Sequence, residues 1–128
     1  MASSAKVVVT HHGHAQHFIA ADSCRFRLAT EVVGPGGRWV ISTVGEMVAL
    51  VPFRRRKGFD EIGSGRLYET YVFALERDAR HDCGCPKIAS LSEIQSRAAN
   101  SAQEATANHA DCVAEWSLAA KDVSSGGK

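Results

Sequence analysis

Several features that mark well-known functional classes are absent from this sequence. No apolar run approaches the roughly 20 residues of a membrane-spanning helix. The valines at 7–9 are too few for the hydrophobic region of a secretory signal, about 7–15 residues. A formal net charge of +1 gives no global reason to bind nucleic acid or a membrane surface. We therefore expect a cytoplasmic protein without a membrane partner.

No internal repeat and no complete catalytic or nucleotide-binding signature is present either, but the chain has the composition of one globular domain. Its 128 residues fall within the usual single-domain range of roughly 100–200. The hydrophobic fraction of 45% and the charged fraction of 23% exclude wholesale disorder. We predict a flexible His-rich arm over residues 1–23, one domain over 24–118 and a flexible tail over 119–128.

The predicted arm carries four histidines in seven residues: His11, His12, His14 and His17. Neutral imidazole is a common ligand of transition metals. Closely spaced imidazoles on a mobile segment, however, bind metals loosely and without function. We therefore interpret the tract as a solvated polar arm.

Alternating residues from 25 onward predict a β-hairpin. Over 25–32, one face of the expected strand carries Phe26, Leu28, Thr30 and Val32. The following Gly-Pro-Gly-Gly at 34–37 is typical of a chain reversal. Residues 38–44 then resume the alternation, so the two segments should pair as antiparallel neighbours.

Other segments have β-forming composition without such clear alternation. Residues 47–53 are apolar enough for a third strand, and residues 66–75 are dense in aromatic and branched side chains. The branched residues at 6–10 also have the composition of a short β segment. We expect residues 76–80 to lead off the sheet and a short turn to form near 90–96.

The strongest helix signal begins at Ser101. Ser101 and Glu104 have the spacing of a capping box, in which each side chain satisfies a backbone amide of the first turn. One face of the following helix carries Ala105, His109, Cys112, Val113 and Trp116. The predicted class is α+β, an antiparallel sheet of three or four strands with one long C-terminal helix packed on a face.

Two cysteine and histidine clusters suggest a structural zinc site formed by Cys83, Cys85, His109 and Cys112, with His81 as a substitute ligand. Zinc prefers four tetrahedral thiolate and imidazole ligands, and His109 and Cys112 project the same way from a helix. A closed site of four ligands would join the loop to the helix. The alternatives are that the helix residues face the core and that the loop cysteines are simple thiols or a disulfide.

A cationic run at Arg54, Arg55, Arg56 and Lys57 is the candidate surface for a nucleic acid or a protein. Clustered cations suit phosphates, and a neighbouring aromatic such as Phe53 or Phe59 can stack on a base. A single run on a nearly neutral chain is also typical of a solvated loop or a protein-docking surface.

Catalysis by a cysteine would pair Cys83 or Cys112 with His81 or His109. Nothing in the sequence marks the oxyanion hole that such chemistry needs, so we expect no enzyme.

Four segments together resemble a known group of proteins: RFRLAT at 25–30, WVISTVG at 39–45, RLYETYVF at 66–73 and the helix at 104–116. They are similar to small uncharacterised proteins of bacteriophages and prophages of high-GC bacteria. The resemblance covers roughly residues 24–117. It implies a viral or prophage origin and supplies no established activity or functional residues.

The leading expectation is therefore a small non-enzymatic phage-type accessory protein that binds another protein, either a host factor or a virion component. A zinc-stabilised nucleic-acid-binding module that uses the basic run at 54–57 is the alternative, and a cysteine-dependent enzyme comes third.

Overall fold

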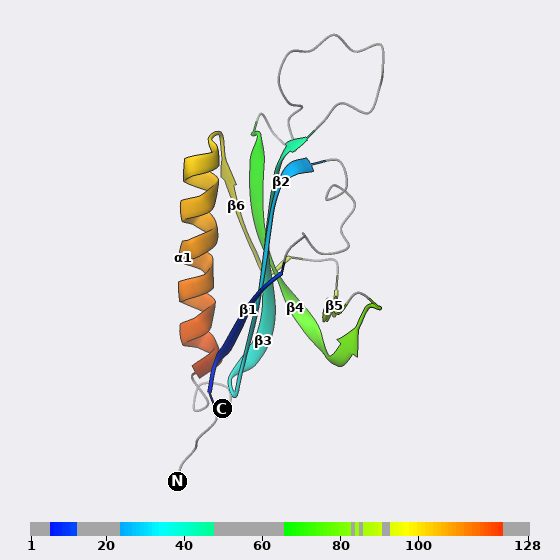
Figure 1. Cartoon of the computed structure of the whole chain (residues 1–128). Helices are drawn as coiled ribbons and strands as arrows, with labels where there is room; N and C mark the ends of the chain where they lie inside the picture. Colours follow the sequence, from blue (N-terminus) through cyan, green and yellow to red (C-terminus); the bar gives the residue numbers. More distant parts are fainter. Residues whose placement is uncertain are drawn as a thin grey trace.

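The fold consists of an antiparallel sheet with one helix across a face (Figure 1). The computed structural model describes residues 6–12, 24–47, 66–82, 84, 86–90 and 93–121. Within them lie β1 (Val8–His12), β2 (Cys24–Gly34), β3 (Gly37–Met47), β4 (Tyr68–Arg80), β5 (Pro86–Ile88), β6 (Gln95–Ala99) and α1 (Ala102–Lys121). The predicted α+β class with a C-terminal helix is confirmed.

The sheet order is β1-β2-β3-β4, and β4 then pairs with two further strands. Its first part, over 68–72, pairs with β6, and its later part, over 75–80, pairs irregularly with β5. Figure 1 shows the end of β4 and β5 curling away from α1. A long strand that bends in this way can serve two partners on one edge.

The prediction of three or four strands was wrong, because the described residues contain six. β5 has three residues and β6 is the polar segment QSRAA, so neither shows the alternation that marks a strand. β4 also continues to Arg80, where we expected the chain to leave the sheet. Residues 48–53 of the predicted third strand lie outside the described residues.

β1 lies at an edge of the sheet and pairs with β2 along its full length, from Val8 opposite Val33 to His12 opposite Ala29. Residues 8–12 thus belong to the sheet, ahead of residue 24, at which we expected the domain to begin. At the other end of the chain, α1 extends to Lys121. No helix in the described part of the chain is long and apolar enough to cross a membrane.

The predicted hairpin is confirmed, with β2 and β3 paired from Cys24 opposite Met47 to Gly34 opposite Gly37. Gly37 has φ 154°, a backbone conformation that favours glycine. The turn also contacts the helix, because the amide of Gly36 donates to the carbonyl of Ala120 at 2.7 Å. This bond satisfies one of the carbonyls that a helix C-terminus leaves unpaired.

The start of α1 is capped much as the sequence predicts. Ser101 Oγ accepts from the amide of Glu104 at 3.1 Å. The Glu104 carboxylate accepts from the amide of Asn100 at 3.3 Å, one residue before the serine amide that we expected. Ala105, His109, Cys112 and Ala120 are buried, so the predicted inward face of the helix is also confirmed.

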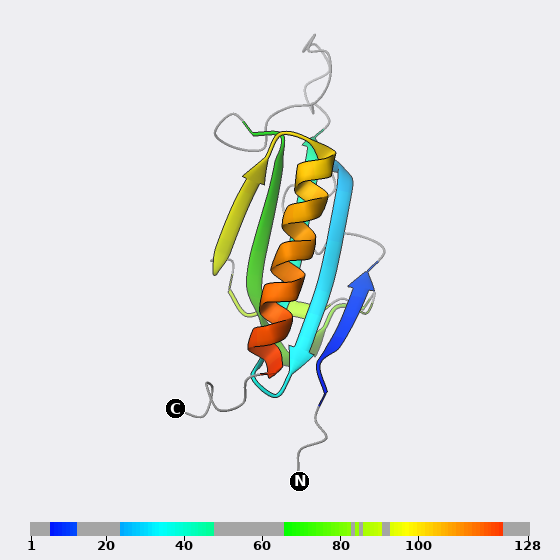
Figure 2. The same ribbon diagram turned by 90° about the vertical axis from the view of Figure 1, so that its left-hand side faces the viewer.

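The helix crosses β2, β3 and β4, and β1 lies beside its C-terminal half (Figure 2). Between helix and sheet, Val32, Ile41 and Val72 form a core with Cys112 and Ala120. The opposite face of the sheet buries a second cluster of Val40, Phe73 and Leu75, against which Ile88 of β5 packs. The helix covers the middle of the sheet and leaves the edge at β1 less covered.

Candidate functional site

A chain of hydrogen bonds crosses the interface between the sheet and α1. His109 lies 7% exposed on the helix, with Nε2 2.8 Å from Thr30 Oγ1 and Nδ1 2.7 Å from Thr43 Oγ1. Thr43 in turn bonds Thr70 at 2.8 Å, and Thr30 bonds His11 Nδ1 at 2.9 Å. The chain therefore joins β1, β2, β3 and β4 to α1 through one buried imidazole.

Burial makes His109 a neutral group. Loss of hydration, with a smaller contribution from the nearby His11 imidazole, lowers the pKa of His109 from 6.5 to about 4. Both of its ring nitrogens bond to threonine hydroxyls, and a neutral imidazole offers one donor and one acceptor for this purpose. His109 thus contributes to the packing of helix on sheet.

Two adjoining cavities lie between α1 and the edge of the sheet. The first, of about 400 Å³, borders β1, β2 and the helix from Thr106 to Ala114, and His11, Thr30 and His109 contribute to its wall. The second, of about 710 Å³, continues from Ala114 to the end of the helix at Lys121. We refer to the two together as the β1–α1 groove.

The walls of this groove are largely apolar. From β1 and the residue before it come Val7 and Val9, and from the flank of α1 come Ala110, Val113, Ala114, Ser117 and Leu118. Leu118 is 66% exposed, the highest value among the large apolar side chains of the described residues, and Val9 is 40% exposed. Contiguous exposed apolar surface of this kind marks interaction sites.

The charge of the groove has one sign and is concentrated at one end. Lys6 and Lys121 both line the second cavity, where the beginning of β1 meets the end of α1. No aspartate or glutamate is among the described residues that line either cavity. The groove therefore combines an apolar wall with a cationic end.

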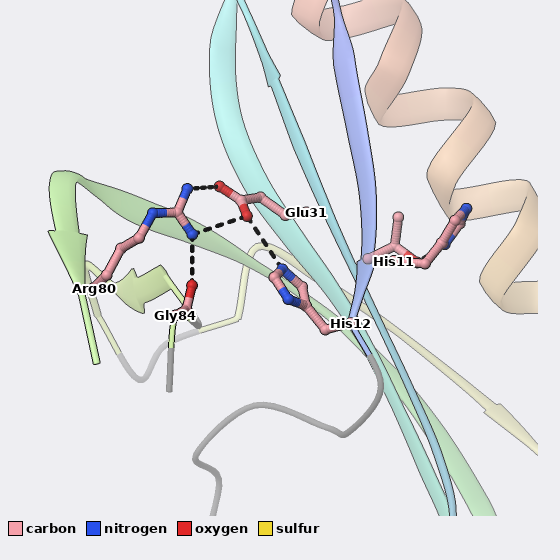
Figure 3. Close-up of polar contacts among 6 residues, drawn as sticks. His11, His12, Glu31, Arg80 and Gly84 are labelled. Atoms are coloured by element: carbon pink, nitrogen blue, oxygen red, sulfur yellow. Dashed lines mark hydrogen bonds and ion pairs between the residues drawn. The ribbon is translucent and has the colours of Figure 1, made fainter. Parts of the chain in front are cut away.

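A separate polar cluster fixes β1 to the other face of the sheet (Figure 3). The Glu31 side chain is 6% exposed, and its carboxylate accepts hydrogen bonds from Arg80 Nη2 at 2.7 Å and from Arg80 Nη1 at 3.2 Å. His12 Nε2 reaches the same carboxylate at 3.1 Å, and Arg80 also donates to the carbonyl of Gly84 at 2.8 Å. Glu31 lies on the face of β2 opposite to Thr30 and Val32, and it is buried there because these partners enclose it.

The structure describes two of the four residues that we predicted as zinc ligands, together with the substitute ligand His81. His109 and Cys112 face the sheet from α1, as the core-facing alternative holds, and Cys112 is fully buried. Cys83 and Cys85 lie outside the described residues, and His81 follows the end of β4. Among the residues that are described, no three histidine, cysteine or acidic side chains group as metal ligands.

The zinc site stays a prediction, because two of its thiolates fall outside the described part of the chain. Metal analysis of protein purified without chelator tests it. One zinc per chain is the result expected for a closed site of four ligands, and a substoichiometric content would contradict it.

Cys112 lacks the features of a catalytic nucleophile. Its thiol is buried against Val32, Ile41 and Val72, and this burial raises its pKa, so the thiol stays protonated. The ring nitrogens of the nearby His109 bond to threonines rather than to this sulfur. The cationic run of Arg54, Arg55, Arg56 and Lys57 lies outside the described residues, so its role in binding also stays a prediction.

Of the described residues that line the groove, the sequence interpretation included only His109 among its candidate site residues. Leu118 is the last residue of the expected domain, and Val7 and Val9 were part of the expected arm. Two signals were present: an exposed leucine off the core-facing stripe of the helix, and branched residues at 7–9 ahead of the first strong strand. No protein-family model, curated protein or solved structure matches the chain.

Proposed function

We propose that this protein is a small non-enzymatic binding protein that holds a segment of another protein in the β1–α1 groove. One observation carries the proposal: the flank of α1 and the inner face of β1 present a continuous apolar wall that no described element covers. Burying such a wall against a partner is favourable at about 25 cal/mol per Å² of apolar surface.

The chemistry of the groove favours binding over catalysis. Its apolar residues line an open trough rather than an enclosed pocket with converging polar groups. The buried histidine at its wall is held by Thr30 and Thr43. An accessory protein of the phage type would act in this way on a host factor or a virion component, and the resemblance implies only the viral or prophage origin of such a protein.

Site-specific photo-crosslinking tests the proposal. A photoreactive amino acid replaces Leu118 in the groove, and in a control protein it replaces Ile94, which is 49% exposed next to β6. We expect crosslinks in cells from position 118 to one or a few discrete proteins. The control position should give none of these products, because it lies at the opposite edge of the sheet.

A second substitution in the groove tests whether the crosslinks depend on its apolar wall. Substitution of Val9 by lysine, with the photoreactive group kept at 118, should abolish the same products because it places a charge in the apolar wall. Equal crosslinking from positions 94 and 118 would refute the proposal.

A further inference from the structure

We infer that the partner segment is an amphipathic helix that lies antiparallel to α1 and places acidic residues of its first turn beside Lys6 and Lys121. The inference rests on the proposed function and names the kind of segment that the β1–α1 groove accepts. Three observations support it: the path of the groove, the residues of its wall and the position of its charges.

The groove follows the helix axis. Its helical lining runs from Thr106 through Ala110, Ala114 and Ser117 to Lys121, at steps of three or four residues, so these side chains form one stripe on α1. At 1.5 Å per residue this stripe is about 22 Å long, the length of a helix of roughly 15 residues. An elongated trough beside an existing helix suits a second helix.

The residues of the wall allow close contact between helices. Ala110, Ala114 and Ser117 are small, so the axis of a second helix can approach α1, while Val9 and Leu118 project from the two sides of the trough. An extended peptide paired with the outer edge of β1 would leave the flank of α1 exposed. A helix covers both walls, and it completes a second layer over the edge that α1 leaves uncovered.

The dipole of α1 favours an antiparallel partner helix, and the two lysines then require acidic residues in the first turn of that helix. Lys6 and Lys121 lie at the end of the groove where α1 terminates. An antiparallel helix begins at this end, so its partly positive N-terminus meets the partly negative C-terminus of α1. Acidic residues are favoured in the first turn of a helix and would there face both lysines.

Binding of defined peptides to the full-length protein tests the inference. Two amphipathic peptides of 16 residues carry the same apolar stripe and the same glutamates, placed either in the first turn or in the last turn. We expect the first peptide to bind about tenfold more tightly at low salt, because only its glutamates meet the lysines in the antiparallel orientation. A third peptide with a central proline, which breaks the helix, should not bind.

Charge reversal supplies the decisive comparison. The wild type should bind a peptide with glutamates in its first turn more tightly than one with lysines there. The variant K6E/K121E should show the reverse order of affinities. Exposed Lys87 on β5 lies outside the groove, and K87E is the matched control that should leave all affinities unchanged. Circular dichroism of each variant establishes that the fold is intact.

The outcomes separate this inference from the proposed function. Three results would contradict a bound antiparallel helix: equal affinities for the two glutamate peptides, no binding of the first one at about 1 mM, or binding of the proline peptide. Crosslinks from position 118 would still support the groove as a binding site. Binding of the fatty acid decanoate in the groove without displacement of the bound peptide would also overturn the inference, because the peptide would then bind elsewhere. Unchanged peptide binding by L118K would overturn both.

Discussion

Replacing Arg80 with alanine should lower the free energy of unfolding by about 3 kcal/mol. The substitution removes two hydrogen bonds from a Glu31 carboxylate that is 6% exposed, and His12 is then the one partner left to it among the described residues. Removal of one partner from a buried ion pair typically costs about 3–5 kcal/mol, since the remaining charge is desolvated without compensation. We expect the lower end because the Arg80 side chain is 50% exposed.

Urea denaturation at pH 7 measures this loss. The matched control is Arg77→Ala, which removes an exposed arginine three residues earlier on β4 and should change stability by less than about 0.5 kcal/mol. Combining Arg80→Ala with Glu31→Leu should recover part of the loss, because the unpaired carboxylate is then absent. Equal effects of Arg80→Ala and Arg77→Ala would contradict a stabilising role for this cluster.

Acidification should remove about 3 kcal/mol of stability through His109 alone. Its pKa falls from 6.5 to about 4 on folding, chiefly by burial and secondarily through His11. Between these values the unfolded chain binds a proton that the folded chain does not. The contribution of His109 is therefore complete above about pH 6.5, is lost as the pH falls toward 4, and changes no further below that.

The measurement is the difference between the pH profiles of the wild type and His109→Gln, which has no titrating group at this position. The wild-type curve should fall more steeply between pH 6.5 and 4, although the variant is less stable at pH 7 because it disturbs the bonds to Thr30 and Thr43. His11→Gln is the control and should keep most of the slope, because His11 is only the secondary cause of the lowered pKa of His109. Parallel profiles for wild type and His109→Gln would exclude the assignment.

Those parts of the fold that depend on local pattern could be predicted from the sequence. Alternation over 25–32 and 38–44 with a glycine-rich turn between them defines the hairpin, and the Ser101 and Glu104 cap defines the start of α1. β5 and β6 escaped prediction because their pairing with β4 is decided by tertiary contacts, which override weak local preference.

Less of the candidate site than of the fold could be predicted from the sequence. The helix stripe correctly placed His109 and Cys112 on the inward face, but residue type alone did not show that two threonines hold the imidazole. The groove required knowledge that β1 lies beside the C-terminal half of α1, which brings Lys6 next to Lys121. No local pattern encodes this proximity, because the two lysines lie near opposite ends of the chain.

The hydrogen bond from Gly36 to Ala120 has a consequence for the order in which the chain folds. The hairpin of β2 and β3 closes through a two-residue turn, which loses little loop entropy, so it can form early. The end of α1 docks on that same turn, and a side chain on Gly34 would meet the Ala120 carbonyl at 2.5 Å. The end of α1 can therefore make this contact only after the turn has formed, and we expect the hairpin to form before the helix docks on it.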